Sequence, residues 1–306
     1  AALVHGKGAP TPGSSDDLGS GLSGPTAHFR RMEQAVSSHE LAPAVDAHLA
    51  FARGVVDRHL RTSSGFATLA EIAGLAAWLA ADRGDHATAR RRYAEAVQHA
   101  HRAHHPLLAS YMTASLGSFA VESGDPRRGV ALLDRATLQL DAAAPDTARS
   151  WLASLRAVAH AHVGDRASTY DALRSAEALA ERHGGDPTWP WVFAFDAAKA
   201  ARFRTTALAR IGDVRAAMDA HRCADTRHTG PKPRALALLE HAGLLARTGQ
   251  DDVSCRLAVD ALHIGRAYRS ERIVTGVRAF RAGLPTHVSD ATTLDDELTA
   301  HDEETW

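Results

Sequence analysis

The chain has only two cysteines, Cys223 and Cys255, among its 306 residues. Such a sparse pair does not make a disulfide framework, and the residues around each cysteine show no metal-ligand spacing. This cysteine usage is typical of a cytoplasmic protein. Asparagine is missing, and lysine occurs only at Lys7, Lys199 and Lys232, so arginine carries nearly all of the positive charge. That bias is usual in GC-rich bacterial genomes such as those of actinobacteria.

An excess of charge of either sign is also missing. The formal net charge is -1 and the isoelectric point is about 7.1, which gives no overall attraction to nucleic acid or to an anionic membrane. No stretch approaches the roughly 18 uncharged apolar residues that a membrane span needs. Residues 1–25 have no apolar core that could act as a signal peptide. We therefore expect no membrane contact and no DNA binding by this chain alone.

Aromatic residues make up only 6% of the chain, and runs of β-branched residues are nearly absent. The hydrophobic fraction is nevertheless 45%, and most of it is alanine and leucine. These residues favour helices that pack at close range over sheets. The composition therefore predicts an all-α protein with a large core.

A short turn motif recurs through the middle of the chain at intervals of 40, 40, 48 and 37 residues. Its copies are Gly84-Asp85, Gly124-Asp125, Gly164-Asp165, Gly212-Asp213 and Gly249-Gln250. In each copy the glycine can end one helix with a positive φ, and the following Asp or a nearby acid can cap the next helix. The pattern predicts an α-solenoid of about five to six helical hairpins with capping helices.

The composition divides the chain into three parts. Residues 1–25, rich in glycine, serine and proline, are expected to form a flexible linker. They indicate either that the chain is the C-terminal portion of a longer protein or that its N-terminus was trimmed. Residues 26–285 hold the repeats. Residues 286–306 are expected to form an acidic, mostly solvated tail with one short helix at 294–300.

The second helix of several units carries a small, a bulky and a small residue at i, i+4 and i+7, such as Ala89, Tyr93 and Ala96. This order resembles the tetratricopeptide repeat, although the units here are longer and most lack its Trp, Tyr and closing Pro. Residues 26–32 (TAHFRRM), 69–80 (LAEIAGLAAWLA) and 85–93 (DHATARRRY) look more narrowly like the C-terminal sensor region of actinobacterial Xre-type transcriptional regulators. The resemblance implies a helix-turn-helix DNA-binding domain upstream. DNA contact is then expected only through that domain, which is absent from this chain.

The first helix of each hairpin in a solenoid lines the concave wall, so positions 13, 10, 6 and 2 before each turn glycine are expected to face a groove. The candidate ligand-binding residues chosen in this way are Glu71, Trp78, Tyr111, Ser118, Trp151, Ser154, His162, Lys199, Arg202, Thr206, Arg210, Glu240 and Arg247. Aromatic residues gather at one end and cations at the other, which suits a small amphipathic ligand or a short peptide with a carboxylate. The alternative is that the aromatic side chains pack between units and the arginines are only solvated. The aromatic segment 186–195 either covers the groove as a wall or bridges two units.

Metal and catalytic motifs receive little support. His101 and His105 have the i, i+4 spacing of a metal-binding helix, but no third ligand accompanies them, and histidines near a helix C-terminus are favoured by the helix dipole. The sequence shows no phosphate-binding loop, nucleophile elbow or Cys-His pair. We expect no metal, no cofactor and no enzymatic activity.

The sequence therefore predicts a ligand-sensing regulatory domain that binds a small molecule or peptide in its groove and signals to an upstream DNA-binding domain. The alternative is a tetratricopeptide-type adaptor that binds a protein partner and no small molecule. Homodimerisation remains open in both cases.

Overall fold

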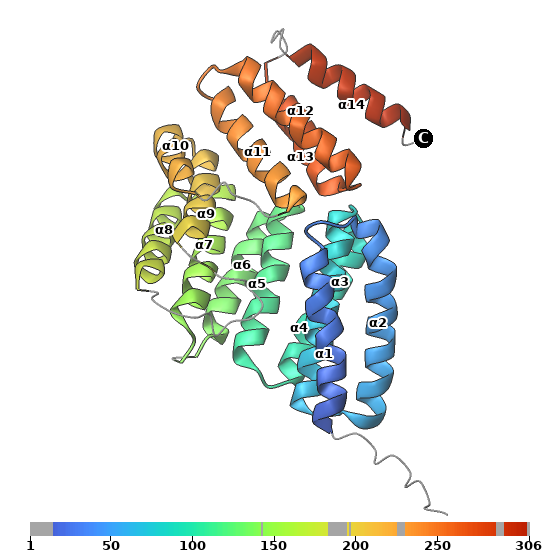
Figure 1. Ribbon diagram of the computed structural model, residues 1–306. Coiled ribbons are helices and arrows are strands. Elements are labelled where there is room, and N and C mark those ends of the chain that lie inside the picture. Colours follow the sequence, from blue (N-terminus) through green and yellow to red (C-terminus); the bar gives the residue numbers. More distant parts are fainter. Residues whose placement is uncertain are drawn as a thin grey trace, which may run out of the picture.

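The computed structural model describes residues 15–141, 143–182, 195, 197–224, 230–285 and 291–304, which form fourteen helices and no strand. The helices are α1 (Ser15–Met32), α2 (Ser38–His59), α3 (Ser63–Asp82), α4 (His86–Arg102), α5 (Pro106–Glu122), α6 (Pro126–Gln139), α7 (Asp146–His162), α8 (Arg166–Glu181), α9 (Ala197–Arg210), α10 (Val214–Cys223), α11 (Pro231–Ala246), α12 (Asp251–Ala267), α13 (Glu271–Gly283) and α14 (Thr292–Glu304). Successive helices pack as hairpins, from α3 with α4 to α11 with α12 (Figure 1). The predicted all-α solenoid is confirmed. Of the aromatic segment 186–195, only Phe195 lies within the described residues.

The turn glycines stand where the spacing predicted them. Gly84, Gly124, Gly164, Gly212 and Gly249 all have a positive φ, between 75° and 90°. The acid after each of the first four glycines caps the next helix, because its side chain accepts a hydrogen bond from a backbone N–H three residues on, as Asp85 does from Thr88 at 3.0 Å. Gln250 makes no such side-chain cap. Local sequence therefore fixes where each hairpin turns.

Small residues let the two helices of a hairpin approach closely. Gly117 of α5 faces Gly129 of α6, and a Cβ added to Gly129 would lie 2.4 Å from Val121 Cγ2 and 3.0 Å from the Gly117 carbonyl oxygen. Gly117 stands seven residues before its turn glycine, Gly124. The residues seven positions before the other turn glycines are Ala77, Ala157, Thr205 and Ala242, and all four are fully buried. Close contact between small residues is thus repeated along the array.

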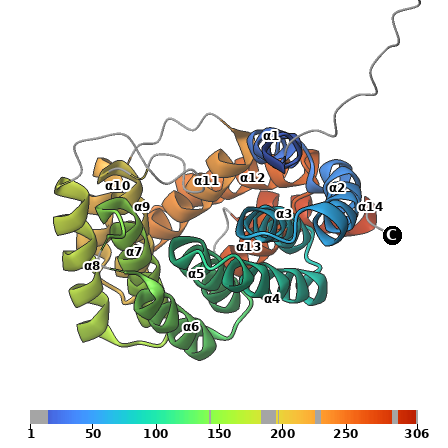
Figure 2. The ribbon, with the colours of Figure 1, turned by 90° about the horizontal axis from the view of Figure 1, so that it is seen from below.

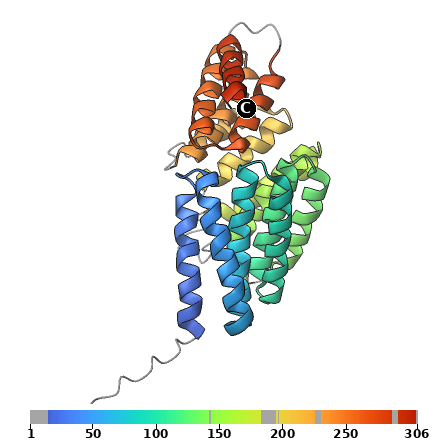
Figure 3. The same ribbon diagram turned by 90° about the vertical axis from the view of Figure 1, so that its right-hand side faces the viewer.

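The last unit does not extend the array away from its start. Helices α11–α14 lie across one end of α1–α5 (Figures 1 and 3). Lys232, near the start of α11, forms an ion pair with Asp82, at the end of α3, although the two are 150 residues apart. Arg272, near the start of α13, forms an ion pair with Glu122, at the end of α5. The solenoid therefore folds back on its own first units, which the repeat pattern did not predict.

The two ends of the chain differ from the expected linker and tail. The first helix begins at Ser15 rather than near Pro25, so residues 15–25 are helical, whereas residues 1–14 lie outside the described part. Leu22 and Thr26 are buried, and the His48 ring nitrogen lies 3.0 Å from the Leu22 carbonyl oxygen and 3.1 Å from Thr26 Oγ1. These contacts with His48 of α2 hold α1 on both sides of Pro25. Composition alone could not show them.

At the other end, α14 is longer than the short helix expected at 294–300, and it packs against α12. Leu294 is fully buried, and Arg281 of α13 forms a bidentate ion pair with Asp295 at 2.6 and 2.8 Å. The acids that were expected to be solvated therefore include partners for arginines on neighbouring helices.

Among the described residues, α3 is the single helix long and apolar enough to cross a membrane, a feature that the sequence analysis did not expect. Two thirds of its apolar window (67%) is buried inside the protein, as in a core helix. Its apolar character therefore has a sufficient explanation in packing.

Candidate functional site

The concave face of the array encloses a cavity of about 960 Å³. Its walls come from the first helix of successive hairpins, α3, α5, α7, α9 and α11, together with α13 and the residues that follow α1. Figure 2 shows these helices arranged around one central region. A smaller cavity of about 390 Å³ adjoins it between α3, α5 and α7 and shares Trp78, Trp151 and Arg272 with it. We call the smaller cavity the narrow end and the larger one the wide end. Because α11 and α13 lie over the first units, the groove that the sequence predicted is covered on one side.

The narrow end of the cavity is aromatic. Tyr111 of α5 and Trp151 of α7 have ring centroids 5.4 Å apart, and both line this part together with Trp78 and Phe203. The Trp78 Nε1–H donates a hydrogen bond of 2.9 Å to Glu33 Oε2. These rings offer a surface on which an apolar or planar group can stack.

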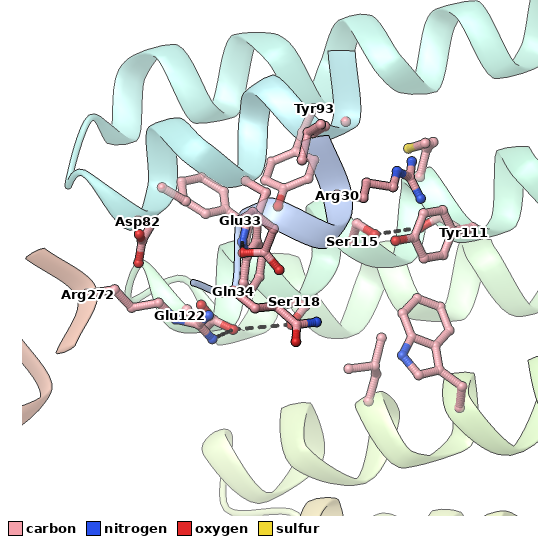
Figure 4. A pocket seen from close by; sticks show the side chains of 18 of the residues that line it. Arg30, Glu33, Gln34, Asp82, Tyr93, Tyr111, Ser115, Ser118, Glu122 and Arg272 are labelled. Carbon is pink, nitrogen blue, oxygen red and sulfur yellow. Dashed lines mark hydrogen bonds and ion pairs between the residues drawn. The ribbon is translucent and has the colours of Figure 1, made fainter. Parts of the chain in front are cut away.

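Charged side chains border this aromatic surface (Figure 4). The Arg272 guanidinium lies 4.7 Å from the centre of the Trp78 ring and forms a 3.0 Å ion pair with Glu122. Burial raises the pKa of Glu33 above its ordinary value, and the Trp78 hydrogen bond and the Lys232 charge oppose that rise only partly. Glu33 therefore holds its proton more tightly than a solvated glutamate does.

The wide end of the cavity is cationic. Arg202 and Arg210 from α9 and Arg247 from α11 line it, and their side chains form no hydrogen bond or ion pair within the described part of the chain. The carboxylate on this wall is Glu240, which accepts a hydrogen bond from Thr206. Burial in the concave wall raises the pKa of Glu240, and the Thr206 hydrogen bond and the Arg202 charge offset this in part. Three guanidinium groups therefore belong to the lining of this end of the cavity.

His162, at the end of α7, faces the same wall. Burial lowers its pKa, and the nearby charge of Arg210 lowers it further. The imidazole is therefore expected to be neutral at pH 7 and to act there as a hydrogen-bonding group.

Most of the candidate residues chosen from the sequence meet in this one cavity. Those that line it are Trp78, Tyr111, Ser118, Trp151, His162, Lys199, Arg202, Thr206, Arg210, Glu240 and Arg247. Two others do not. Ser154 is buried and donates its hydroxyl hydrogen bond to the Ser150 carbonyl oxygen within α7, and the Glu71 carboxylate lies 4.0 Å from Arg30. Whether the lining residues bind a ligand stays a prediction.

The sequence left two alternatives for the aromatic side chains, namely that they face the groove or that they pack between units, and two of them do both. Trp151 belongs to a buried apolar cluster and still lines the cavity. Trp78 packs against another such cluster and also faces the cavity. Each ring therefore stabilises the repeat and shapes the site at once.

Sequence reasoning missed the residues that cover the cavity, namely Glu33, Gln34, Asp82, Lys232, Glu271 and Arg272. The rule based on the turn glycines concerns the wall of each hairpin and says nothing of contacts between the first and last units. No local signal marks these residues, because they meet through the folding back of α11–α14.

No group of three His, Cys, Asp or Glu side chains suited to a metal ion occurs within the described ranges. His105 caps α5 by accepting a hydrogen bond from the Leu108 N–H at 3.3 Å. His101 lies 3.4 Å from the Gln139 amide nitrogen. Both histidines of the i, i+4 pair thus have structural contacts.

Fold and cavity together define a helical-hairpin solenoid that is folded back over a partly enclosed cavity. No family model matches the sequence, and no curated protein matches it either. Among solved structures, the chain is similar to BtubC (BKLC) from P. vanneervenii, with a TM-score of 0.50 and 15% identity over 76% of this chain and 92% of that one. The APC/C hetero-tetramer Cut9-Hcn1 matches with a TM-score of 0.45 and 13% identity over 82% of this chain and 45% of that one. At such identities the likeness to BtubC concerns the fold alone.

Proposed function

We propose that this chain is a ligand-sensing regulatory domain whose cavity binds a small amphipathic anion or a short peptide with a free carboxylate. One observation carries the proposal. Arg202, Arg210 and Arg247 line a cavity of about 960 Å³, their side chains form no hydrogen bond or ion pair with any residue that the structure describes, and the far end of that cavity is aromatic.

The two ends of the cavity support one orientation of the ligand. A guanidinium group binds a carboxylate or phosphate through two parallel hydrogen bonds, and these are strongest where water is partly excluded. The Tyr111 and Trp151 rings provide the apolar contact at the other end. The volume lies within the range of roughly 300–1,000 Å³ that is usual for small-molecule sites.

The regulatory part of the proposal rests on the resemblance to Xre-type sensor regions. A ligand that prefers one shape of the array by about 1 to 3 kcal/mol changes the affinity of an attached DNA-binding domain by roughly 5- to 150-fold. The proposed role is binding rather than catalysis. Helical arrays serve mainly as binding surfaces.

The test compares carboxylates with their neutral amides. The purified chain is titrated with 1-anilinonaphthalene-8-sulfonate, arylalkyl carboxylates and short peptides, and unfolding temperature and probe fluorescence are followed. We expect saturable binding of the anions, about tenfold weaker binding of the matched amides, and a rise in unfolding temperature.

The arginine variants provide the internal control. Arg202→Gln is expected to weaken anion binding about tenfold, because it removes one charge-assisted contact. Arg215→Gln makes the same change at an exposed residue of α10, outside the cavity, and should have no effect. Equal behaviour of the two variants, or no anion that stabilises the chain, contradicts the proposal.

A protein-protein adaptor is the second candidate, and the solenoid fold favours it because helical repeats commonly present a concave surface to a partner. A stoichiometric partner retained by the chain, and released by variants of the cavity wall in the absence of any small molecule, would support this candidate instead.

A further inference from the structure

The contact between the first and last units is centred on one buried carboxylate. Asp82 Oδ2 accepts hydrogen bonds from Ser38 Oγ at 2.5 Å and from Lys232 Nζ at 3.1 Å, and Asp82 Oδ1 accepts one from Ser270 Oγ at 2.5 Å. Lys232 also lies 3.1 Å from Ser38 Oγ. None of the four residues is more than 5% exposed. We call Ser38, Asp82, Lys232 and Ser270 the latch.

The latch joins parts of the chain that are remote in sequence. Ser38 begins α2 and Asp82 ends α3, whereas Lys232 lies in the first turn of α11 and Ser270 caps α13. Burial by itself would raise the pKa of Asp82, but the Lys232 charge and the serine hydrogen bonds hold it below its ordinary value. Asp82 is therefore charged at neutral pH and paired with Lys232.

Among the described residues, no buried apolar cluster spans this contact. The buried cluster of the first units contains only residues of α1–α5 and the segments that join them, and the cluster around Val274 and Val277 contains only residues of α11–α14. At the other end of α11, Leu244 belongs to an apolar cluster shared with α7–α10. The unit α11–α14 is thus held by apolar packing near α10 and by polar contacts at the latch.

Because one contact of α11–α14 is apolar and the other is polar, the polar contact at the latch is the one that can open. Separating an apolar cluster exposes hydrocarbon to water, which is costly in proportion to area. A buried ion pair contributes little net stability, because the energy of desolvating its charges nearly cancels their attraction. When the pair opens, water solvates both charges again.

The latch is also part of the cavity wall. Asp82 and Lys232 line the cavity, and Arg272, two residues after Ser270, reaches over Trp78 at the aromatic end. A ligand in the cavity contacts the walls on both sides of the latch, so it binds best when they are together.

From these contacts we infer that α11–α14 is a latched lid, which pivots at its apolar contact with α7–α10, opens by parting Asp82 from Lys232, and controls entry to the cavity. The closing effect of a bound ligand rests on the proposed function. The lid itself does not, because its opening is a property of the empty chain.

Hydrogen exchange of the empty chain tests the lid directly. In Asp82→Asn, buried Lys232 loses its hydrogen-bonded carboxylate and keeps only Glu33, 4.0 Å away. In Lys232→Met, Asp82 stays buried with its serine partners and no cation. We expect amides at the start of α11, the start of α13 and the end of α3 to exchange at least tenfold faster, while those of α5–α8 keep their rates. The double variant removes both charges of the Asp82–Lys232 pair and should recover most of the protection.

Asp171→Asn is the matched control, since it breaks an exposed pair with Arg174 on α8. It should leave every exchange rate unchanged. Faster exchange that is uniform over all helices, or unchanged exchange at the latch in both single variants, would overturn the lid, because the latch would then be an ordinary part of one cooperative unit.

A disulfide cross-link between α11 and the residues that follow α1 tests the lid independently of the proposed ligand binding. A Cβ built on Gly230 lies 2.9 Å from Gln34 Cβ, so Gln34→Cys with Gly230→Cys, in a Cys223→Ser background, can form a disulfide after a shift of roughly 1 Å. Oxidation is expected to slow entry of 1-anilinonaphthalene-8-sulfonate at least tenfold, and reduction should restore it. Equal entry rates in both forms refute the lid and leave binding intact. If the probe does not bind even the reduced form, the proposed function is in doubt, and hydrogen exchange still decides on the lid.

Discussion

Replacing one glycine at a time by alanine tests whether close helix contact or helix propensity decides stability in this array. Gly129 in α6 and Gly243 in α11 both lie inside helices, where alanine is favoured by about 1 kcal/mol. At Gly243 nothing lies within 4 Å of the added Cβ. Gly243→Ala should therefore raise the free energy of unfolding by up to about 1 kcal/mol.

At Gly129 the same methyl group meets two obstacles. It would lie 2.4 Å from Val121 Cγ2 and 3.0 Å from the Gly117 carbonyl oxygen. A buried valine has few alternative rotamers, and the carbonyl cannot move without moving α5. Overpacking of this kind costs about 1–3 kcal/mol, which exceeds the gain in propensity. Gly129→Ala should lower the free energy of unfolding by about 1 kcal/mol.

Urea unfolding followed by circular dichroism measures both changes against the unmodified chain. The expected difference between the two variants is about 2 kcal/mol, with opposite signs and an unchanged dependence on urea. If Gly129→Ala is as stable as Gly243→Ala, the helices of the second hairpin are not in close contact there, and the packing argument for the repeat fails.

Three further predictions concern a turn, a cap and a buried acid. Gly164→Ala should lower the free energy of unfolding, measured in urea, by about 1 kcal/mol. Nothing lies within 4 Å of the added Cβ, but φ is +78°, a left-handed conformation that alanine disfavours. Asp125→Ala removes the cap on the Arg128 N–H and should cost about 1 kcal/mol by the same assay, with exposed Asp171→Ala as a reference. Glu33→Gln keeps an acceptor for Trp78. Because the folded-state pKa of Glu33 is raised, its stabilising contribution is present at low pH and is lost as pH rises through that value. The variant should therefore have the higher unfolding temperature at pH 7, with an advantage that shrinks towards pH 4; an advantage that grows in acid would contradict the burial argument.

The candidate site could be predicted from sequence as far as the repeat extends. Trp78, Trp151 and Arg202 stand at fixed distances before their turn glycines, and a hairpin of known period places such positions on one wall. Ser154 follows the same rule and yet is buried, and its hydroxyl donates a hydrogen bond to the backbone of its own helix. The rule gives a face of the helix and not the direction of each side chain.

The two ends of the chain show the limit of composition. Glycine and serine before Pro25, and acids after Pro285, are typical of solvated segments. Leu22 and Leu294 nevertheless bury themselves against other helices. A single anchored side chain with a partner elsewhere in the chain outweighs the average of its neighbours.

The sequence by itself determined the hairpins, because glycine at the turn, aspartate at the cap and alanine at the contact act within about ten residues of one another. Only the tertiary structure decided that the array closes. Asp82 and Lys232 are 150 residues apart, and nothing in either neighbourhood marks them as partners. Small rotations accumulate over successive hairpins, so whether the last unit reaches the first depends on the sum of all packing angles, which no local pattern contains.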